Sequence, residues 1–296
     1  MLEPDARTIA HMNEWLDLVY LQVQEQAPAL LPIYNIYADE ARFGRRYIDE
    51  ELQLLDPGDN VLEVGAGAML LSCQLAREGF NITALEPTGA GFSHFSCLRS
   101  LALYCADQLD CRPNIIELPA EALVMSEEFS FAFSVNVMEH VDSVESSIEN
   151  IGRSLRLGGK YRFTCPNYLF PYEPHFNMPT LFSKSLTERL LNGYIFNASH
   201  LTDPSGTWRS LNWINVLQIK KCTRRSKTLR ATFNRGFLTQ TLERVNDDKA
   251  FAARRSAWMR MLIRLVVRLR LHHSLMLVPA AVQPIIDCTI KKDGSR

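Results

Sequence analysis

The chain has 296 residues, 47% of them hydrophobic, and a formal net charge of −1, which suffices for one large α/β domain with insertions or a domain with a small appendage. No stretch of roughly 18 uncharged apolar residues is present, and the N-terminus is acidic where a signal peptide would be basic. We therefore expect a cytoplasmic protein that does not span a membrane. The seven cysteines include no Cys-x-x-Cys pair, so neither a disulfide framework nor a metal site is expected.

Helices and strands alternate along the first 166 residues. Helical periodicity covers 8–26 and 35–54, and a turn cluster follows at 56–59. Strands are predicted at 61–64, 81–85, 114–117, 129–135 and 160–165, with helices over 69–79, 92–108 and 144–155 between them. Five strands that alternate with helices predict a doubly wound, Rossmann-like parallel sheet.

The rest of the chain lacks this regular alternation of helices and strands. Periodicity fails between 166 and 207, which predicts a loop-rich insertion at the carboxyl end of the fifth strand, where open α/β sheets bind ligands. Helices are then expected over 208–222 and 237–272, and strands over 227–233 and 284–290, which would form an antiparallel edge of the sheet. We accordingly divide the chain into an N-terminal helical lid (1–56), a cofactor-binding core (57–166) and a substrate-side part with basic helices and closing strands (167–296).

A glycine-rich turn follows the first strand. In the segment Glu63-Val64-Gly65-Ala66-Gly67, the two glycines allow a sharp turn and a close approach to a ligand, and the next helix presents free N–H groups. NAD enzymes share this Gly-x-Gly, but Leu70 stands where their third glycine belongs, which disfavours a pyrophosphate site. A tight turn needed only for packing remains an alternative.

A carboxylate ends the second strand. Glu86 comes 21 residues after Gly65, a position from which it can accept hydrogen bonds from both hydroxyls of a ribose. NAD and S-adenosylmethionine both need that contact. Glu63, just before the loop, can help to receive a cationic amino-acid group, so charge favours the sulfonium cofactor.

Over residues 35–168 the sequence resembles the class I S-adenosylmethionine-dependent methyltransferases of the ubiquinone-biosynthesis-like group. The resemblance rests on Val61-Leu62-Glu63-Val64-Gly65-Ala66-Gly67, Leu85-Glu86-Pro87, Pro119-Ala120-Glu121-Ala122-Leu123 and Val137-Met138-Glu139-His140-Val141. It implies that the segment with Ala120 and Glu121 closes over the adenine and that the segment with Asn136 passes near the methyl group. An Asp that is frequent in the family is Pro119 here, so backbone N–H groups and Glu121 would have to bind the adenine amino group.

Two segments carry candidate catalytic residues. Glu139-His140 follows the fourth strand, where a titratable pair could orient substrate or accept a proton, although His140 could equally cap or pack on the next helix. The insertion brings Tyr172, Glu173 and His175 together on a proline-stiffened loop. His175 is the preferred general base, while Tyr172 and Glu173 could equally hold the loop in place.

The C-terminal part is basic. Residues 209–272 contain 16 Lys and Arg against 3 Asp and Glu. Within 250–272, six arginines accompany an apolar stripe at helical spacing, which is typical of an interfacial helix rather than of a nucleic-acid groove. This pattern allows peripheral contact with the inner face of a membrane, and we expect no nucleic acid. An amphipathic helix packed on its own sheet or on a partner is the favoured interpretation of the stripe.

These features predict an S-adenosylmethionine-dependent methyltransferase that O-methylates a small-molecule, glycan or lipid-linked acceptor. The alternatives are a non-catalytic adenosylmethionine-binding or scaffold protein and an NAD-linked oxidoreductase. No metal is expected to take part.

Overall fold

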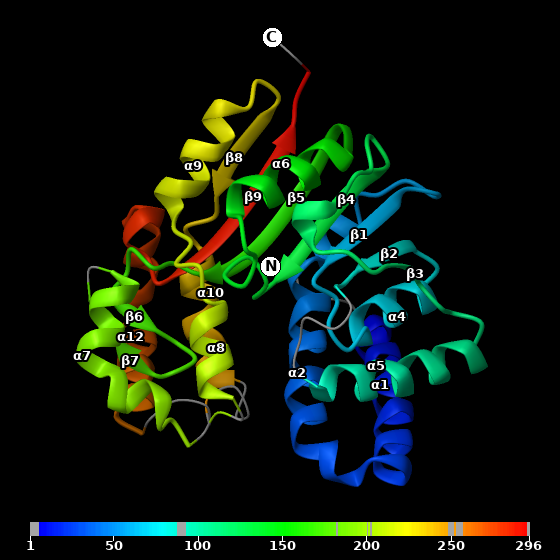
Figure 1. Cartoon of the computed structure of the whole chain (residues 1–296), viewed down its shortest axis with the longest axis horizontal. Coiled ribbons are helices and arrows are strands. Elements are labelled where there is room, and N and C mark those ends of the chain that lie inside the picture. Colours follow the sequence, from blue (N-terminus) through cyan, green and yellow to red (C-terminus); the bar gives the residue numbers. More distant parts are fainter. Residues whose placement is uncertain are drawn as a thin grey trace.

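One seven-stranded sheet organises the molecule, in the order β3-β2-β1-β4-β5-β9-β8 (Figure 1). The computed structural model describes residues 6–87, 93–181, 183–199, 201, 203–247, 252 and 257–294. The strands are β1 (Asn60–Val64), β2 (Asn81–Leu85), β3 (Asn114–Ile116), β4 (Phe129–Val135), β5 (Leu155–Pro166), β8 (Leu229–Phe233) and β9 (Ile285–Lys292). The first five pair in parallel, and β9 is antiparallel to both β5 and β8. The prediction of a mostly parallel Rossmann-like sheet with an antiparallel edge is confirmed.

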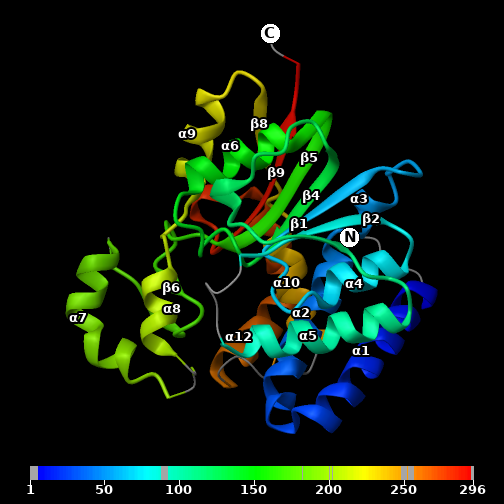
Figure 2. The ribbon, with the colours of Figure 1, turned by 45° about the vertical axis from the view of Figure 1, so that its right-hand side comes forward.

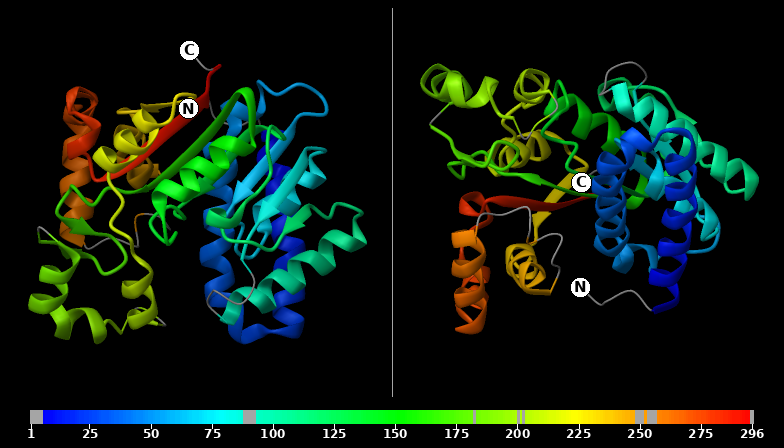
Figure 3. Two further views of the ribbon diagram at one scale, coloured as in Figure 1. Left: turned by 45° about the horizontal axis from the view of Figure 1, so that its top comes forward. Right: turned by 90° about the horizontal axis from the view of Figure 1, so that it is seen from below.

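Helices cover both faces of this sheet (Figure 3). One face carries α1 (Ala6–Gln26), α2 (Leu31–Tyr47), α4 (Leu70–Arg77) and α5 (Ser93–Gln108), and the other carries α6 (Val144–Ser154) and α9 (Val216–Arg225). Three short helices, η1 (Pro28–Leu30), α3 (Asp49–Leu52) and η2 (Ala120–Ala122), lie in the connections.

A separate hydrophobic core lies on each face of the sheet, because successive side chains of a strand point to opposite faces. On β4, Phe131 and Phe133 pack with the N-terminal helices, whereas Ala132 packs with the α6 side. Phe129 also joins the α6 side, because the pairing of β4 with β5 shifts its register between Phe129 and Phe131. Both faces are therefore apolar, as a central parallel sheet requires.

Buried ion pairs join the N-terminal helices to the rest of the fold. Arg162 on β5 pairs with Asp287 on β9 (3.0 Å) and with Glu51 (2.8 Å), and the Tyr47 hydroxyl donates to Asp287 (2.6 Å). Arg45 on α2 is buried and pairs with Asp49 of α3 and with Glu78 at the end of α4. The N-terminal helices are thus integral to the domain.

The insertion after β5 is more regular than its sequence suggests. It contains a short hairpin of β6 (Tyr172–Glu173) and β7 (Met178–Pro179), followed by α7 (Lys184–Phe196) and α8 (Pro204–Ser210) (Figure 2). The expectation of a mainly irregular segment was wrong for these two helices. Only Thr187 and Ile195 of α7 are buried, so the helix lacks the apolar stripe by which helices are recognised in sequence.

The helix expected over 208–222 is also interrupted. Residues 211–215 between α8 and α9 are not helical, and Trp213 has a left-handed φ of +60°. The Asn215 side chain caps α9 by accepting a hydrogen bond from the amide of Gln218 (3.0 Å). Asn side chains favour such breaks because they compete for the backbone hydrogen bonds of a helix.

The C-terminal basic segment contains α10 (Phe237–Asp247) and α12 (Ala257–Arg268), and η3 (Leu271–Leu277) and η4 (Ala280–Val282) lead into β9. Arg254 and Arg255, two of the six arginines, lie outside the described residues. Among the helices that the structure describes, none has the length and apolar character needed to cross a bilayer.

Candidate active site

The loop after β1 has the backbone conformation that its glycines permit. Gly65 and Gly67 have φ values of +74° and +51°, and Gly65 donates its N–H to the carbonyl of Leu85 at the end of β2 (2.8 Å). A Cβ atom on Gly65 would lie 2.5 Å from a methyl group of Val137. The loop therefore lies directly against the segment that follows β4.

Glu86 at the end of β2 faces this loop. Its Oε2 accepts the N–H of Gly67 at 2.8 Å, and burial raises the pKa of its carboxyl group. Each carboxylate oxygen has two lone pairs, so the group has the capacity to accept ribose hydroxyls as well. The strand end, the glycine loop and this carboxylate fit the adenosine half of S-adenosylmethionine.

Glu63 is more deeply buried than expected for a residue that contacts a ligand directly. Ser72 on α4 donates its hydroxyl to the Glu63 carboxylate, and burial raises the pKa of Glu63 to about 8. Ala66, by contrast, lies in the turn itself, where its carbonyl accepts the N–H of Met69 (2.8 Å).

The other predicted cofactor segments also end at this edge of the sheet. Ala120 and Glu121 begin η2, and the Glu121 carboxylate accepts the N–H of Ser143 before α6 (3.0 Å). Asn136 follows β4 with a φ of +53° and donates its N–H to Thr164 on β5 (2.9 Å). The loops after β1, β2 and β4 thus converge as the sequence predicts for a doubly wound sheet.

His140 lies in the turn after β4 in a defined tautomer. Its Nδ1 is 2.9 Å from the Ser210 hydroxyl, which donates to the carbonyl of Thr207 (2.9 Å). With the hydroxyl proton directed at Thr207, we assign Nδ1–H of His140 as the donor to Ser210, which leaves the lone pair of the neutral ring on Nε2. Burial, together with the charge of His175, lowers the pKa of His140 to about 4.

His175 is held by the buried carboxylate of Glu173. Glu173 accepts hydrogen bonds from Nδ1 of His175 (2.6 Å), from the Phe176 amide (2.6 Å) and from the Tyr168 hydroxyl (3.2 Å). Burial opposes protonation of His175, but the hydrogen bond and charge of Glu173 prevail and raise its pKa. Tyr172 lies outside this arrangement, and its hydroxyl donates to Asn177 (2.9 Å).

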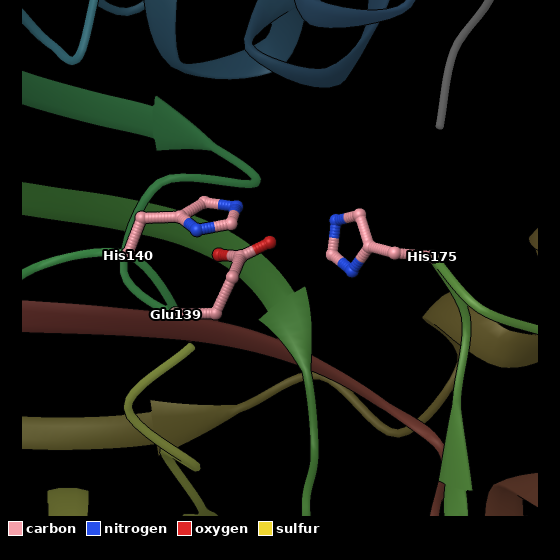
Figure 4. Close-up of side chains that lie close together, drawn as sticks. All are labelled: Glu139, His140 and His175. Carbon is pink, nitrogen blue, oxygen red and sulfur yellow. The ribbon is translucent and has the colours of Figure 1, made fainter. Parts of the chain in front are cut away.

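Glu139 lies between the two histidines, in a group formed from the end of β4 and the insertion (Figure 4). The ligand-capable atoms of Glu139, His140 and His175 all lie within 4.8 Å of one another, and the two rings meet edge to face with centroids 5.5 Å apart. Glu139 has 0% exposure, neither of its carboxylate oxygens has a hydrogen-bond partner within the described part of the chain, and burial raises its pKa to about 7.

Asn212 fixes the turn that carries Glu139 and His140, and sequence reasoning missed it. The side-chain Nδ2 of Asn212 donates to the carbonyls of Met138 (2.8 Å) and Val141 (2.7 Å). Its backbone N–H donates to the carbonyl of Glu139 (2.8 Å). No local motif marks Asn212 or Ser210, because each acts on a turn some 70 residues earlier.

Comparison with known proteins agrees with this geometry. A family model described as a methyltransferase domain matches residues 37–222, which is more than half of the chain. The chain belongs to this methyltransferase family. The resemblance to class I S-adenosylmethionine-dependent methyltransferases is confirmed, and this assignment excludes an NAD-linked oxidoreductase.

Individual relatives differ in how much of the methyltransferase they match. An uncharacterised protein of Mycobacterium tuberculosis (strain H37Rv) is 45% identical over 97% of both chains. The ubiquinone biosynthesis O-methyltransferase of Paramagnetospirillum magneticum is 34% identical over 41% of this chain and 45% of its own.

The chain is also similar, more weakly, to solved structures. The Haemonchus contortus phosphoethanolamine N-methyltransferase 2 has a TM-score of 0.49 and 16% identity, and the match covers 83% of this chain and about half (51%) of that one. The geranyl diphosphate C-methyltransferase of Streptomyces coelicolor has a TM-score of 0.49 and 11% identity, over 88% and 78% of the two chains.

Proposed function

We propose that this methyltransferase transfers the methyl group of S-adenosylmethionine to a hydroxyl oxygen of a small-molecule, glycan or lipid-linked acceptor. The observation that carries the proposal is the group of Glu139, His140 and His175. Glu139 follows β4 two residues beyond Val137, which lies against the cofactor loop. A hydroxyl is a poor nucleophile until it loses its proton, and such a group can assist that loss.

The bound cofactor supplies an electrophilic methyl group on a sulfonium that leaves as a neutral thioether. His175 is the proposed proton acceptor. Because Glu173 engages Nδ1 (2.6 Å), the proton of the acceptor hydroxyl would be received at Nε2, and the buried carboxylate would stabilise the resulting imidazolium. Glu173 is a positioning residue, since its hydrogen bonds hold the ring and the hairpin.

We propose Glu63, Gly65, Ala66, Gly67, Glu86, Ala120, Glu121 and Asn136 as the cofactor-binding set. Glu86 would accept the ribose hydroxyls, and the glycine loop would admit the ligand to the backbone. Glu121 would act on the adenine mainly by fixing η2, since its carboxylate already binds the Ser143 amide (3.0 Å). Asn136 would lie near the methyl end of the cofactor.

Peripheral contact with an anionic membrane is the second part of the proposal. Helix α12 buries Ile263 against α10 but leaves Met261 (72%) and Leu265 (52%) exposed. Arg264 and Arg268 are exposed on the same helix, so apolar side chains and positive charges share the surface. Intramolecular packing thus accounts for only part of the apolar stripe, and the exposed part suits a lipid interface or a lipid-linked acceptor.

The kind of atom methylated can be tested before the acceptor is identified. The protein is incubated with adenosylmethionine labelled in the methyl group and a cell extract, and the labelled product is treated with hydriodic acid. This reagent releases the methyl of an ether as volatile methyl iodide but leaves methyl on carbon. Release of the label supports the proposal, whereas label that remains on carbon or proves to be on nitrogen contradicts it.

A further inference from the structure

We infer that Glu139, His140 and His175 form a binding site for one divalent transition-metal ion. The first observation is the composition of the group. Two imidazoles and one carboxylate, with ligand atoms within 4.8 Å of one another, make a set that suits Zn²⁺, Fe²⁺ or Co²⁺ better than Mg²⁺ or Ca²⁺. Ligand atoms of one such ion lie about 3 to 4 Å apart, so small side-chain rotations would close the site.

The second observation is the state of Glu139. Its side chain has 0% exposure and both oxygens lack a hydrogen-bond partner among the described residues. A buried carboxylate without partners is costly, and buried charges in proteins are normally paired or coordinate a metal. Neither histidine relieves this cost by a hydrogen bond to Glu139. Their Nδ1 atoms bind Ser210 and Glu173 instead.

These outer hydrogen bonds are themselves typical of metal ligands. A ligating histidine usually donates its other ring N–H to a carboxylate, carbonyl or hydroxyl, which fixes its tautomer and orientation. Ser210 does this for His140 (2.9 Å) and Glu173 does it for His175 (2.6 Å), so Nε2 is the atom that each ring would present to an ion. Asn212 adds a rigid turn beneath the first two ligands.

A second group of similar composition provides a contrast. Glu243, His272 and His273 also bring ligand-capable atoms within 4.8 Å, but Glu243 is 42% exposed and already pairs with Nε2 of His272 at 3.0 Å. That carboxylate is solvated and partnered, so it has no need of a cation, unlike the buried carboxylate of Glu139. The contrast places the ion at Glu139, against the expectation from sequence that no metal takes part.

The inference rests on the proposed function for the use of the ion but not for its binding. Three protein ligands leave coordination positions open, and these could accept one or two oxygen atoms of a hydroxyl-bearing acceptor. In the ion-bound protein, Nε2 of His175 would be a ligand instead of the proton acceptor. The ion would lower the pKa of the bound hydroxyl, whose proton would pass to solvent water as the methyl group is transferred.

The test uses the full chain, stripped of metal with a chelator, and titrates it with Zn²⁺ and with Co²⁺ as a spectroscopic probe. We expect one ion per chain and a Co²⁺ absorption typical of nitrogen and oxygen ligands. Glu139→Gln keeps the shape of the side chain and should weaken binding at least tenfold. Ser210→Ala, which is not a ligand, should weaken it to a lesser degree, and Glu243→Gln should bind like the wild type.

Circular dichroism and adenosylmethionine affinity verify that each variant is folded. No saturable binding, or binding lost in Glu243→Gln but kept in Glu139→Gln, would overturn the inference. Methyl transfer to oxygen at full rate by the metal-free protein would reject the catalytic use of the ion and leave both the proposed function and the binding site standing. A tightly bound ion at Glu139 with transfer only to nitrogen or carbon would reject the proposed function and leave the metal site standing.

Discussion

Nδ1 of His175 lies 2.6 Å from Oε1 of Glu173, a carboxylate with 0% exposure. Because Glu173 also accepts from the Phe176 amide and the Tyr168 hydroxyl, it joins the proposed catalytic histidine to the fold of the hairpin. Glu173→Gln would place an N–H₂ group among donors, and we expect a loss of about 1 to 3 kcal/mol in the free energy of unfolding. We also expect slower methyl transfer with nearly unchanged adenosylmethionine affinity.

Urea denaturation and calorimetry check these expectations, with Glu145→Gln in α6 as a matched change at an exposed carboxylate. If Glu173→Gln and Glu145→Gln have equal stability and equal activity, Glu173 does not position His175.

The cofactor loop yields a second prediction. Glu86→Ala should weaken adenosylmethionine binding by about 1 to 3 kcal/mol, because the ribose would lose its acceptor. Gly65→Val should weaken it further, since a side chain at φ +74° is strained and would collide with Val137. Calorimetric titration measures both, with Glu128→Ala, an exposed carboxylate before β4, as the control. Wild-type affinity in both folded variants would refute this cofactor site.

A third prediction concerns Glu63 and pH. Burial raises its pKa from 4.5 in the unfolded chain to about 8 in the folded one, so the folded state holds the proton more tightly between these values. This group's contribution to stability is therefore fully present below about pH 4.5 and is lost as pH rises through about 8. The wild type should lose stability relative to Glu63→Gln between pH 5 and pH 8 in urea denaturation without cofactor. If the free energies of unfolding of the wild type and of Glu63→Gln change in parallel over that pH range, the pKa of Glu63 is not raised.

The exposed apolar face of α12 gives a fourth prediction. The protein should float with anionic vesicles at low salt and be released as salt rises, because each basic residue near the surface contributes about 1 kcal/mol. Leu262→Glu combined with Leu265→Glu should abolish flotation, while Leu54→Glu, at an exposed leucine far along the chain from α12, should not. If the wild type and the double variant float to the same extent, the apolar stripe of α12 serves intramolecular packing alone.

The sheet could be predicted because its signals are local. Strands and turns are marked by features a few residues long, such as the Gly-x-Gly turn, the strand-ending Glu86 and the apolar run of β4. The predicted bounds of β4 agree with the observed ones, Phe129–Val135. Helix α7 could not be predicted from periodicity, since most of its surface faces solvent. The break at 211–215 was missed because the asparagines that stabilise it act through side-chain hydrogen bonds.

The candidate site was predictable only in its parts. The sequence marks His140 by a motif after the fourth strand and His175 by a proline-rich loop, without relating the two. Their ring centroids lie 5.5 Å apart because the insertion folds back towards the end of β4. Ser210 and Asn212 carry no signal in one sequence, because their importance arises from turns that they contact across the fold. The lack of hydrogen-bond partners for the Glu139 carboxylate likewise depends on how distant segments pack around it, which one sequence does not show.

We propose above all that the acceptor reacts at His175, beside a separate cofactor pocket. The most direct test of this proposal measures both adenosylmethionine affinity, by calorimetry, and methyl-transfer rate, with labelled cofactor, in the single variant His175→Ala. We predict affinity within about twofold of wild type and a rate reduced by about 100-fold or more, since the lost interaction acts on the transition state. A fully active His175→Ala protein from pH 6 to 9 would contradict the claim.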